Sequence, residues 1–464
     1  MIMANSSRQY SREKMKSIDN RKTRLPSPLV TILVVWSIPL VIIGLGIIRY
    51  ENINFESWGT LYLIGGVILF TFGFILSPRV SVVPSQRGSY IESMQNRFME
   101  DVRRYGRLID YLAACGLIAG ILFTIEMIFI VGIDPTDFSA TREAFTFRQT
   151  TLFSQLASVL AAGGYISLVS VIVCWDYLPR GKKFFWLISP LSITVFSLFS
   201  AGRQTLFQLI LIAFFSFLIY RIIRKAPRRS LGTAIFFGGV IVATIGYFMI
   251  VSSQRSGYEV EGMKRELLYR GFLVHLDYPI ENRIDNLVPV LKDGIAELVI
   301  YLTHPIPNFL IFYELPRPGP YWGLWELPFL ARRAESVGLV SSSVRERIDN
   351  VYDLFSNSGR SPQVWQTTFR DLIIDFGDIG ALFVTVILGY IAGWVFYMNQ
   401  TRGGLVWAYL LVGVHLICVY SVIISAISDT LIFFYLVIAM VLYFYYESPG
   451  KTRHPSRVIP VLKQ

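Results

Sequence analysis

The chain has 464 residues, of which 53% are hydrophobic, 15% aromatic and only 16% charged. This composition is too apolar for a soluble domain of that length. The formal net charge of +11 does not indicate a nucleic-acid partner, because the cations gather in short segments beside apolar runs, a pattern typical of membrane proteins.

Ten apolar runs are long enough, or nearly so, to cross a bilayer as α-helices. In chain order the runs are 29–48, 58–76, 111–133, 152–175, 184–200, 205–223, 231–251, 379–398, 405–427 and 430–446. The sequence therefore predicts an all-α polytopic membrane protein with about ten transmembrane helices.

The positions of the cations choose between the two possible orientations. With a cytoplasmic N-terminus, the inner segments hold 26 Lys and Arg, and the short outer loops before residue 252 hold four. Because cytoplasmic loops carry the excess of cations, both termini are predicted to be cytoplasmic. The domains that follow are a cytoplasmic basic tail (1–28), seven transmembrane helices (29–251), an extracytoplasmic segment with amphipathic helices (252–378), three transmembrane helices (379–446) and a cytoplasmic tail (447–464).

The extracytoplasmic segment is the predicted catalytic part of the chain, since it holds 13 of the 43 Lys and Arg. Its run 297–315 is apolar but interrupted by Pro305 and Pro307, so it is expected to lie on the membrane or dip into it. Residues 343–355 place apolar and charged side chains on opposite helical faces. This pattern predicts an amphipathic helix at the membrane interface.

Arginines at the predicted outer boundary are candidates for binding a lipid pyrophosphate. Arg203 lies in a tight connection between two spans, Arg255 follows the seventh span, and Arg142 lies in an outer loop. A guanidinium matches phosphate oxygens, and a lipid pyrophosphate lies at this depth. Arg270 and Arg360 are further candidates. The alternative is that these side chains reach lipid headgroups or anchor helix ends.

An aromatic cluster in the same segment is the candidate sugar-binding surface. Tyr321, Trp322 and Trp325 lie in a Pro-rich stretch, and aromatic faces pack well on the C–H faces of sugar rings. An aromatic belt at the membrane interface is the alternative interpretation. The cysteines all lie inside apolar runs and the four histidines lack metal-binding spacing, so no metal and no cofactor is predicted.

Two ionisable residues, Glu126 and His415, fall inside the predicted spans. Buried charge is costly in a bilayer and usually has a use. His415 is expected to be neutral and hydrogen-bonded between helices. Glu126 lies near the outer end of its helix, where it is expected to reach water or an arginine.

Several short features together resemble the bacterial oligosaccharide repeat-unit polymerases, which build O-antigen and exopolysaccharide chains. The matching features are the large outer loop, Gly202-Arg203 at the start of a span, Arg255 after the following span, and the loop exit with Trp365, Thr367 and Asp375-Phe376-Gly377 ahead of Gly380. The resemblance implies a GT-C-like glycosyltransferase architecture in the bacterial plasma membrane. The implied reaction is a metal-independent inverting transfer of a chain from undecaprenyl pyrophosphate to a lipid-linked repeat unit.

The same resemblance implies roles for particular residues. Arginines would hold the pyrophosphate leaving group, and Trp365 joins the candidate sugar-binding residues. A base must activate the acceptor hydroxyl, for which His275 and His304 are the first candidates and Asp353 is the carboxylate alternative. A flippase and a chain-length regulator are the expected protein partners.

Two other functions fit the same outline. An O-antigen ligase would use the same donor with a lipid A core acceptor, so its product would leave undecaprenyl pyrophosphate. A flippase or exporter of lipid-linked oligosaccharide should line its path with polar intramembrane residues, and only Glu126 and His415 qualify in this sequence.

Overall fold

The computed structural model describes residues 27–50, 53–78, 87–132, 151–199, 204–224, 298–316, 319–327 and 367–447, with Gly246 and single residues between 331 and 353. Within these ranges the chain is helical and contains no β-strand. Five of the described helical segments are long and apolar enough to cross a membrane. They are α3 (Trp58–Leu76), α4 with the π-helix η2 (Arg87–Ile125 and Glu126–Ile130), α6 (Leu152–Val173), α8 (Gln204–Ile223) and α15 (Thr368–Thr401). These are the properties of an all-α multi-pass membrane protein.

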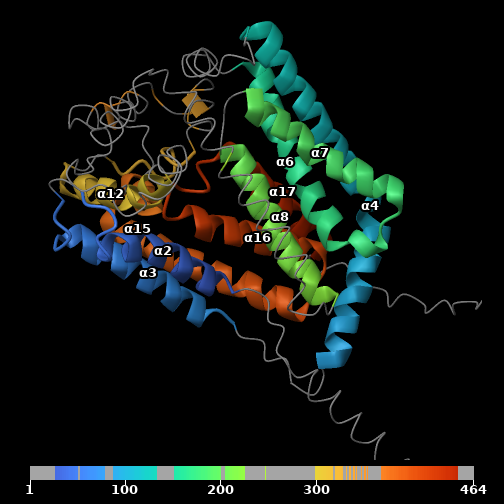
Figure 1. The fold of residues 1–464 in the computed structure, drawn as a ribbon, viewed down its shortest axis with the longest axis horizontal. Coiled ribbons are helices and arrows are strands. Elements are labelled where there is room, and N and C mark those ends of the chain that lie inside the picture. Colours follow the sequence, from blue (N-terminus) through green and yellow to red (C-terminus); the bar gives the residue numbers. More distant parts are fainter. Residues whose placement is uncertain are drawn as a thin grey trace, which may run out of the picture.

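The other described helices are shorter or less apolar. They are α2 (Pro28–Gly44), the 3₁₀ turn η3 (Trp175–Tyr177), α7 (Arg180–Phe199), α12 (Pro305–Glu314), α16 (Leu405–Tyr420) and α17 (Thr430–Glu447). In the bundle, α4 packs along α6 and α7, while α3 packs along α15 (Figure 1). Helix α16 joins these two groups, because it contacts α6 of the first group and α15 of the second, as well as α2, α8 and α17.

Small residues allow the helix backbones in each group to touch. A Cβ atom on Gly73 of α3 would overlap the carbonyl oxygen of Val386 in α15, and a Cβ atom on Gly389 would overlap the carbonyl oxygen of Phe70. Glycines at such positions bring transmembrane helices into close van der Waals contact, which replaces the hydrophobic effect as the force between helices in lipid. Helices α3 and α15 therefore pack closely against each other.

Helix α4 differs from the sequence prediction, which began this span at residue 111. The helix starts at Arg87, so most of the predicted inner loop 77–110 is helical. Met94, Phe98, Tyr105 and Ile109 are buried at spacings of about one and two helical turns, although many of the residues between them are polar or charged. Hydropathy alone missed this extension because one apolar stripe is enough for a helix that packs on one face.

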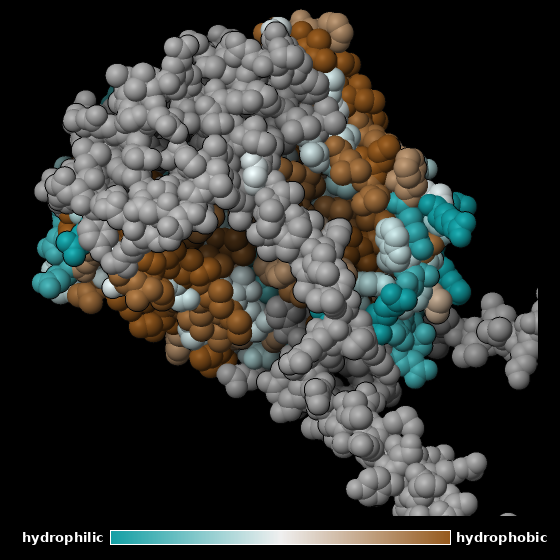
Figure 2. Space-filling model, in the orientation of Figure 1, coloured by the Kyte–Doolittle hydropathy of each residue, from teal (hydrophilic) through white to brown (hydrophobic). Residues whose placement is uncertain are grey.

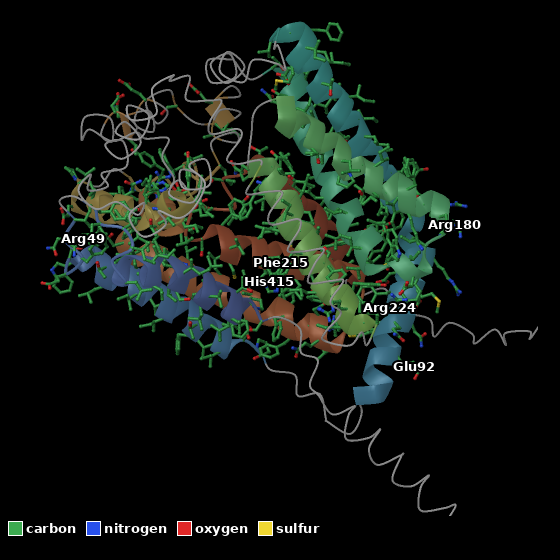
Figure 3. The ribbon with its side chains drawn as sticks, in the orientation of Figure 1. Arg49, Glu92, Arg180, Phe215, Arg224 and His415 are labelled. Carbon is green, nitrogen blue, oxygen red and sulfur yellow. The ribbon has the colours of Figure 1, made fainter. Side chains whose placement is uncertain are left out.

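Apolar and hydrophilic side chains occupy different parts of the surface, and the labelled arginines lie at the two ends of the bundle (Figure 2 and Figure 3). Apolar side chains cover the faces of α2, α3 and α15 that are visible in Figure 2, whereas hydrophilic residues gather near the start of α7. Arg49 lies at one end of the bundle, and Arg180 and Arg224 lie at the opposite end (Figure 3). These two ends are called here the Arg49 end and the Arg224 end.

The intramembrane histidine is placed as the sequence predicted. His415 is buried in α16, and its Nδ1 atom lies 2.9 Å from the Thr31 hydroxyl of α2. Its ring stacks on Phe215 of α8 with ring centres 4.3 Å apart (Figure 3). The expected hydrogen bond between helices is therefore confirmed. Glu126 is also buried and accepts a hydrogen bond of 2.7 Å from Thr151, the residue before α6.

Candidate functional site

A break near the start of α15 organises the most highly charged buried part of the described chain. Gly377 has φ 70° and ψ 178°, so the helix is interrupted there, and only glycine adopts this conformation without strain. The eight residues from Thr368 to Asp375 form a short buried half-helix before the break. The backbone N–H of Trp322 donates to the carbonyl oxygen of Asp375 at 2.8 Å, so residues 319–327 cover the end of this half-helix.

A second break lies beside the first. The sequence predicted one span over 405–427, but α16 ends at Tyr420 and α17 begins at Thr430. Two of the peptide groups between them bond to the half-helix. The carbonyl oxygen of Ser421 accepts from the Thr368 N–H at 2.9 Å, and the Ser425 N–H donates to Asp371 at 3.2 Å. Non-helical backbone at this depth is stable because its polar groups find partners within the protein.

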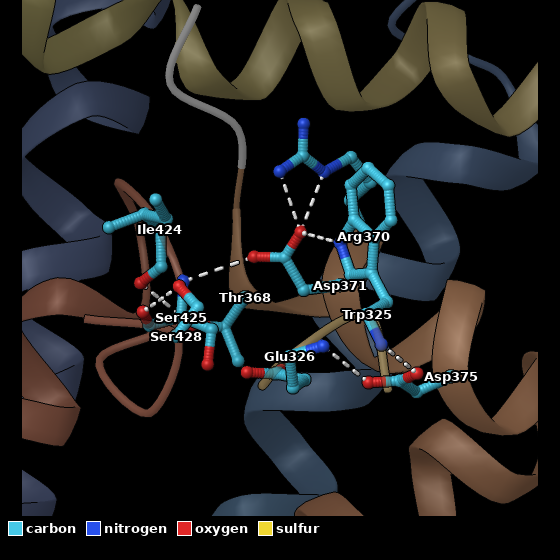
Figure 4. Close-up of polar contacts among 9 residues, drawn as sticks. All are labelled: Trp325, Glu326, Thr368, Arg370, Asp371, Asp375, Ile424, Ser425 and Ser428. Atoms are coloured by element: carbon cyan, nitrogen blue, oxygen red, sulfur yellow. Dashed lines mark hydrogen bonds and ion pairs between the residues drawn. The ribbon is translucent and has the colours of Figure 1, made fainter. Parts of the chain in front are cut away.

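Five residues where these segments meet form what is called here the charge cluster: Trp325, Glu326, Arg370, Asp371 and Asp375 (Figure 4). One oxygen of Asp371, Oδ1, accepts from Arg370 Nη2 at 2.6 Å and Nε at 2.8 Å, and from the Trp325 indole N–H at 2.9 Å. The Arg370 guanidinium also lies 5.7 Å from the centre of the Trp325 ring. The Arg370 and Asp371 side chains are only 7% and 2% exposed, so this is a buried ion pair.

Asp375 is held by backbone amides rather than by a cation. Its two oxygens accept from the N–H groups of Trp325 at 2.9 Å and Glu326 at 2.8 Å (Figure 4). Such donors stabilise a carboxylate without adding positive charge. Asp375 therefore fixes the loop 319–327 to the half-helix.

Glu326 differs from the other two carboxyl groups of the cluster. The residue is 4% exposed, and neither oxygen has a hydrogen-bond partner among the described residues. Burial raises the pKa of Glu326 well above its ordinary value, and the charges of Asp371 and Asp375 raise it further. The Ser425 hydroxyl and the Arg370 guanidinium face this carboxyl and lower its pKa only in part. The site therefore holds a carboxyl group that takes up and releases a proton at an unusually high pH.

The predicted residues that the structure describes lie in different surroundings. His304 precedes α12 and is 1% exposed, and its Nδ1 lies 2.9 Å from the carbonyl oxygen of Ile300. Burial lowers the pKa of His304 to about 4, which makes its ring a weak base. Asp353 is exposed to solvent.

The three predicted sugar-binding aromatics in 319–327 do not share one surface. Tyr321 and Trp325 are buried, and Trp325 belongs to the charge cluster. Trp322 is 75% exposed and has φ 56°, which is unusual for a residue other than glycine. Of these three aromatics, Trp322 is the one whose ring a ligand can reach from solvent.

The remaining predicted site residues lie outside the described part of the chain and stay predictions. They are His275, Trp365 and the five candidate pyrophosphate-binding arginines, Arg142, Arg203, Arg255, Arg270 and Arg360. The structure does describe Gln204, which follows Arg203 in the sequence. Its side-chain amide donates to Asp429 at 2.6 Å, and Gln208 donates to the same oxygen at 2.9 Å.

Glu326, Arg370 and Asp371 were missed as site residues by sequence reasoning. One signal was available, because Asp371 and Asp375 are four residues apart and so share one face of a helix. No local signal joins Glu326 to them, since it lies 45 residues before Asp371 and meets it only in the fold. Among the described residues, no group of three or more His, Cys, Asp or Glu side chains is placed to hold a metal ion.

Comparison with known proteins does not place the chain in a family. No family model, no curated protein sequence and no solved structure matches it.

Proposed function

We propose that this protein joins undecaprenyl-pyrophosphate-linked oligosaccharide repeat units into O-antigen or exopolysaccharide chains on the outer face of a bacterial plasma membrane. The observation that carries the proposal is the position of the charge cluster. It lies where the long segment 252–378 enters the helix α15, next to the broken ends of α15 and α16. A buried acid–base cluster at such a junction suits chemistry performed at the membrane boundary.

The cluster lies at the Arg49 end of the bundle. The Tyr50 hydroxyl lies 2.6 Å from the Thr303 hydroxyl, which precedes α12. The Tyr62 hydroxyl near the start of α3 donates to the carbonyl oxygen of Asp378 at 2.7 Å. Glycosyl transfer from a lipid pyrophosphate needs cations beside the leaving group, a base for the acceptor hydroxyl, and aromatic surface for the sugars. The cluster supplies carboxyl groups and a cation, and Trp322 supplies an exposed ring.

The topology proposed with this function has about ten spans, a GT-C-like arrangement and both termini in the cytoplasm. The separation of Arg49 from Arg180 and Arg224 supports it, because the cation count assigns Arg49 to an outer loop and the other two to inner loops (Figure 3). A reporter enzyme fused after Arg317 is expected to be active outside, and one fused after Arg402 inside. A cytoplasmic signal from the Arg317 fusion would overturn the proposal, because the segment could not then meet lipid-linked sugar on the outer face.

The direct test is synthesis by the purified protein supplied with undecaprenyl-pyrophosphate-linked repeat units. A ladder of longer products that remain on undecaprenyl pyrophosphate is expected. Transfer only to added lipid A core would identify a ligase instead, and movement of the lipid-linked sugar across vesicles without any product would identify a flippase.

Substitution of Arg203 tests the predicted leaving-group contact within that assay. Arg203→Ala is expected to abolish the ladder, since loss of one such donor costs on the order of a hundred- to a thousandfold in rate. Arg203→Lys keeps the charge but loses the planar fork, so strong impairment is expected. Arg224→Ala, which follows the last residue of α8 and is 60% exposed in its side chain, is the matched control. A near wild-type ladder from Arg203→Ala would leave Arg203 as a headgroup anchor.

A further inference from the structure

The hydrogen bonds of the charge cluster distinguish its three carboxyl groups. Asp371 accepts from the side chains of Arg370 and Trp325 and from the Ser425 N–H. Asp375 accepts from two backbone N–H groups of the loop 319–327. Both carboxylates are therefore held by several hydrogen-bond donors among the described residues.

Glu326 is the exception: only the Ser425 hydroxyl faces its carboxyl group as a neutral donor, and neither oxygen has a hydrogen bond of good geometry among the described residues. A carboxyl group that is 4% exposed and so poorly supplied with donors is costly to bury, and a fold selected for stability alone would favour an apolar side chain there. The charges of Asp371, Asp375 and Arg370 all act on this carboxyl group. The position therefore suits a group whose task is to accept a proton.

We propose that Glu326 is the general base of the glycosyl transfer, accepting the proton of the acceptor hydroxyl. This inference rests on the proposed function and assigns one residue a role in its chemistry. It differs from the expectation drawn from the sequence, in which a histidine or Asp353 performs this step.

The step can be written with its bonds balanced. The acceptor sugar oxygen attacks the anomeric carbon of the donor chain, and a new C–O bond forms as the bond from that carbon to the pyrophosphate oxygen breaks. The electron pair of the broken bond leaves with undecaprenyl pyrophosphate. The proton of the acceptor hydroxyl passes to the Glu326 carboxylate, which later releases it to water.

Two further observations fit this role. A general base works best when its pKa is close to the working pH. Burial, followed by the charges of Asp371 and Asp375, raises the pKa of Glu326 well above its ordinary value, and Ser425 and Arg370 lower it only in part. His304, whose pKa is lowered to about 4, is a much weaker base. In addition, the loop that carries Glu326 reaches the surface four residues earlier, at the exposed Trp322.

The test uses the full-length protein in the ladder assay, with rates measured from pH 5 to pH 9. The wild-type kcat/KM is expected to rise with pH as the carboxyl group ionises, with an apparent pKa well above the ordinary glutamate range. Glu326→Gln is expected to lower kcat by on the order of a hundred- to ten-thousandfold and to flatten that rise. Its KM for the lipid-linked repeat unit is expected to stay within about twofold, because the base acts in the transition state rather than in binding.

Two more variants make the result independent of folding. Glu326→Asp keeps a carboxyl group, so it is expected to retain measurable activity and the rise with pH. Glu314→Gln removes an exposed carboxylate of the same segment and is expected to match the wild type. If Glu326→Gln keeps a near wild-type rate, or is slow but shows the same rise with pH, Glu326 is not the base. A wild-type protein that builds no ladder would instead contradict the proposed function itself.

Discussion

The two ends of the bundle contain the same three-residue arrangement in two different environments. At the Arg224 end, Asp110 accepts from Lys182 at 2.6 Å and from the Trp186 indole N–H at 2.7 Å. In the charge cluster, Asp371 accepts from Arg370 and the Trp325 indole N–H. In both sets the cation also lies 5.7 Å from the centre of the indole ring.

Burial separates the two arrangements. The Lys182 and Asp110 side chains are 37% and 32% exposed, whereas Arg370 and Asp371 are 7% and 2% exposed. Water screens the first pair, so its net contribution to stability is small. The second pair has lost its hydration, and its charges depend on each other. The arrangement of an Asp, a cation and a Trp therefore links α7 to α4 through a partly exposed ion pair at one end and forms a buried ion pair at the other.

The largest expected difference concerns the cations. Arg370→Met leaves three buried carboxyl groups without a cation and is expected to destabilise the protein by about 3–5 kcal/mol. Lys182→Met breaks a partly exposed pair and is expected to cost less than about 1 kcal/mol. Thermal unfolding of both variants in the same detergent measures the difference. Equal losses would mean that burial does not separate the two ends.

Removing the indole N–H donors tests the same comparison, and a smaller difference in stability is expected. Trp325→Phe removes one donor to a buried carboxylate, for which about 1–3 kcal/mol is expected. Trp186→Phe makes the same change beside the partly exposed Asp110, where water replaces the donor, so a loss below about 1 kcal/mol is expected. Because the substitution is identical, the loss of ring volume largely cancels between the two. If unfolding measurements show a larger loss of stability for Trp186→Phe than for Trp325→Phe, burial does not set the strength of this hydrogen bond.

The last expected difference is a dependence on pH, which arises from the additional carboxyl group in the charge cluster. The pKa of Glu326 is higher in the folded state than in the unfolded state, so the folded state binds more protons between these two values. Stability is then complete below the ordinary glutamate pKa and falls as the pH rises towards the raised value. Glu326→Gln removes this loss, so its stability relative to wild type is expected to grow by about 1 kcal/mol per pH unit over that window. A constant difference between pH 5 and pH 8 would show that the Glu326 pKa is not raised.

The sequence alone determined the helical, membrane-type character of the chain and the extent of several helices. The bounds of α3 agree with the predicted run 58–76 at both ends, and α8 starts one residue before the predicted 205–223. Pro305 was expected to interrupt the run 297–315, and α12 does begin at that residue. These features are local, because a run of apolar side chains or a missing backbone N–H acts on its own segment whatever the rest of the chain does.

Only the tertiary structure decided where the charged groups meet. The predicted span 405–427 stops at Tyr420 because Ser421 and Ser425 find partners on the half-helix before Gly377, which no local pattern reveals. Glu326 looked like part of an aromatic loop, yet it lies against Asp371 and Asp375 of another element. Its proton affinity depends on burial and on those neighbouring charges, and both are properties of the folded arrangement rather than of the residue type.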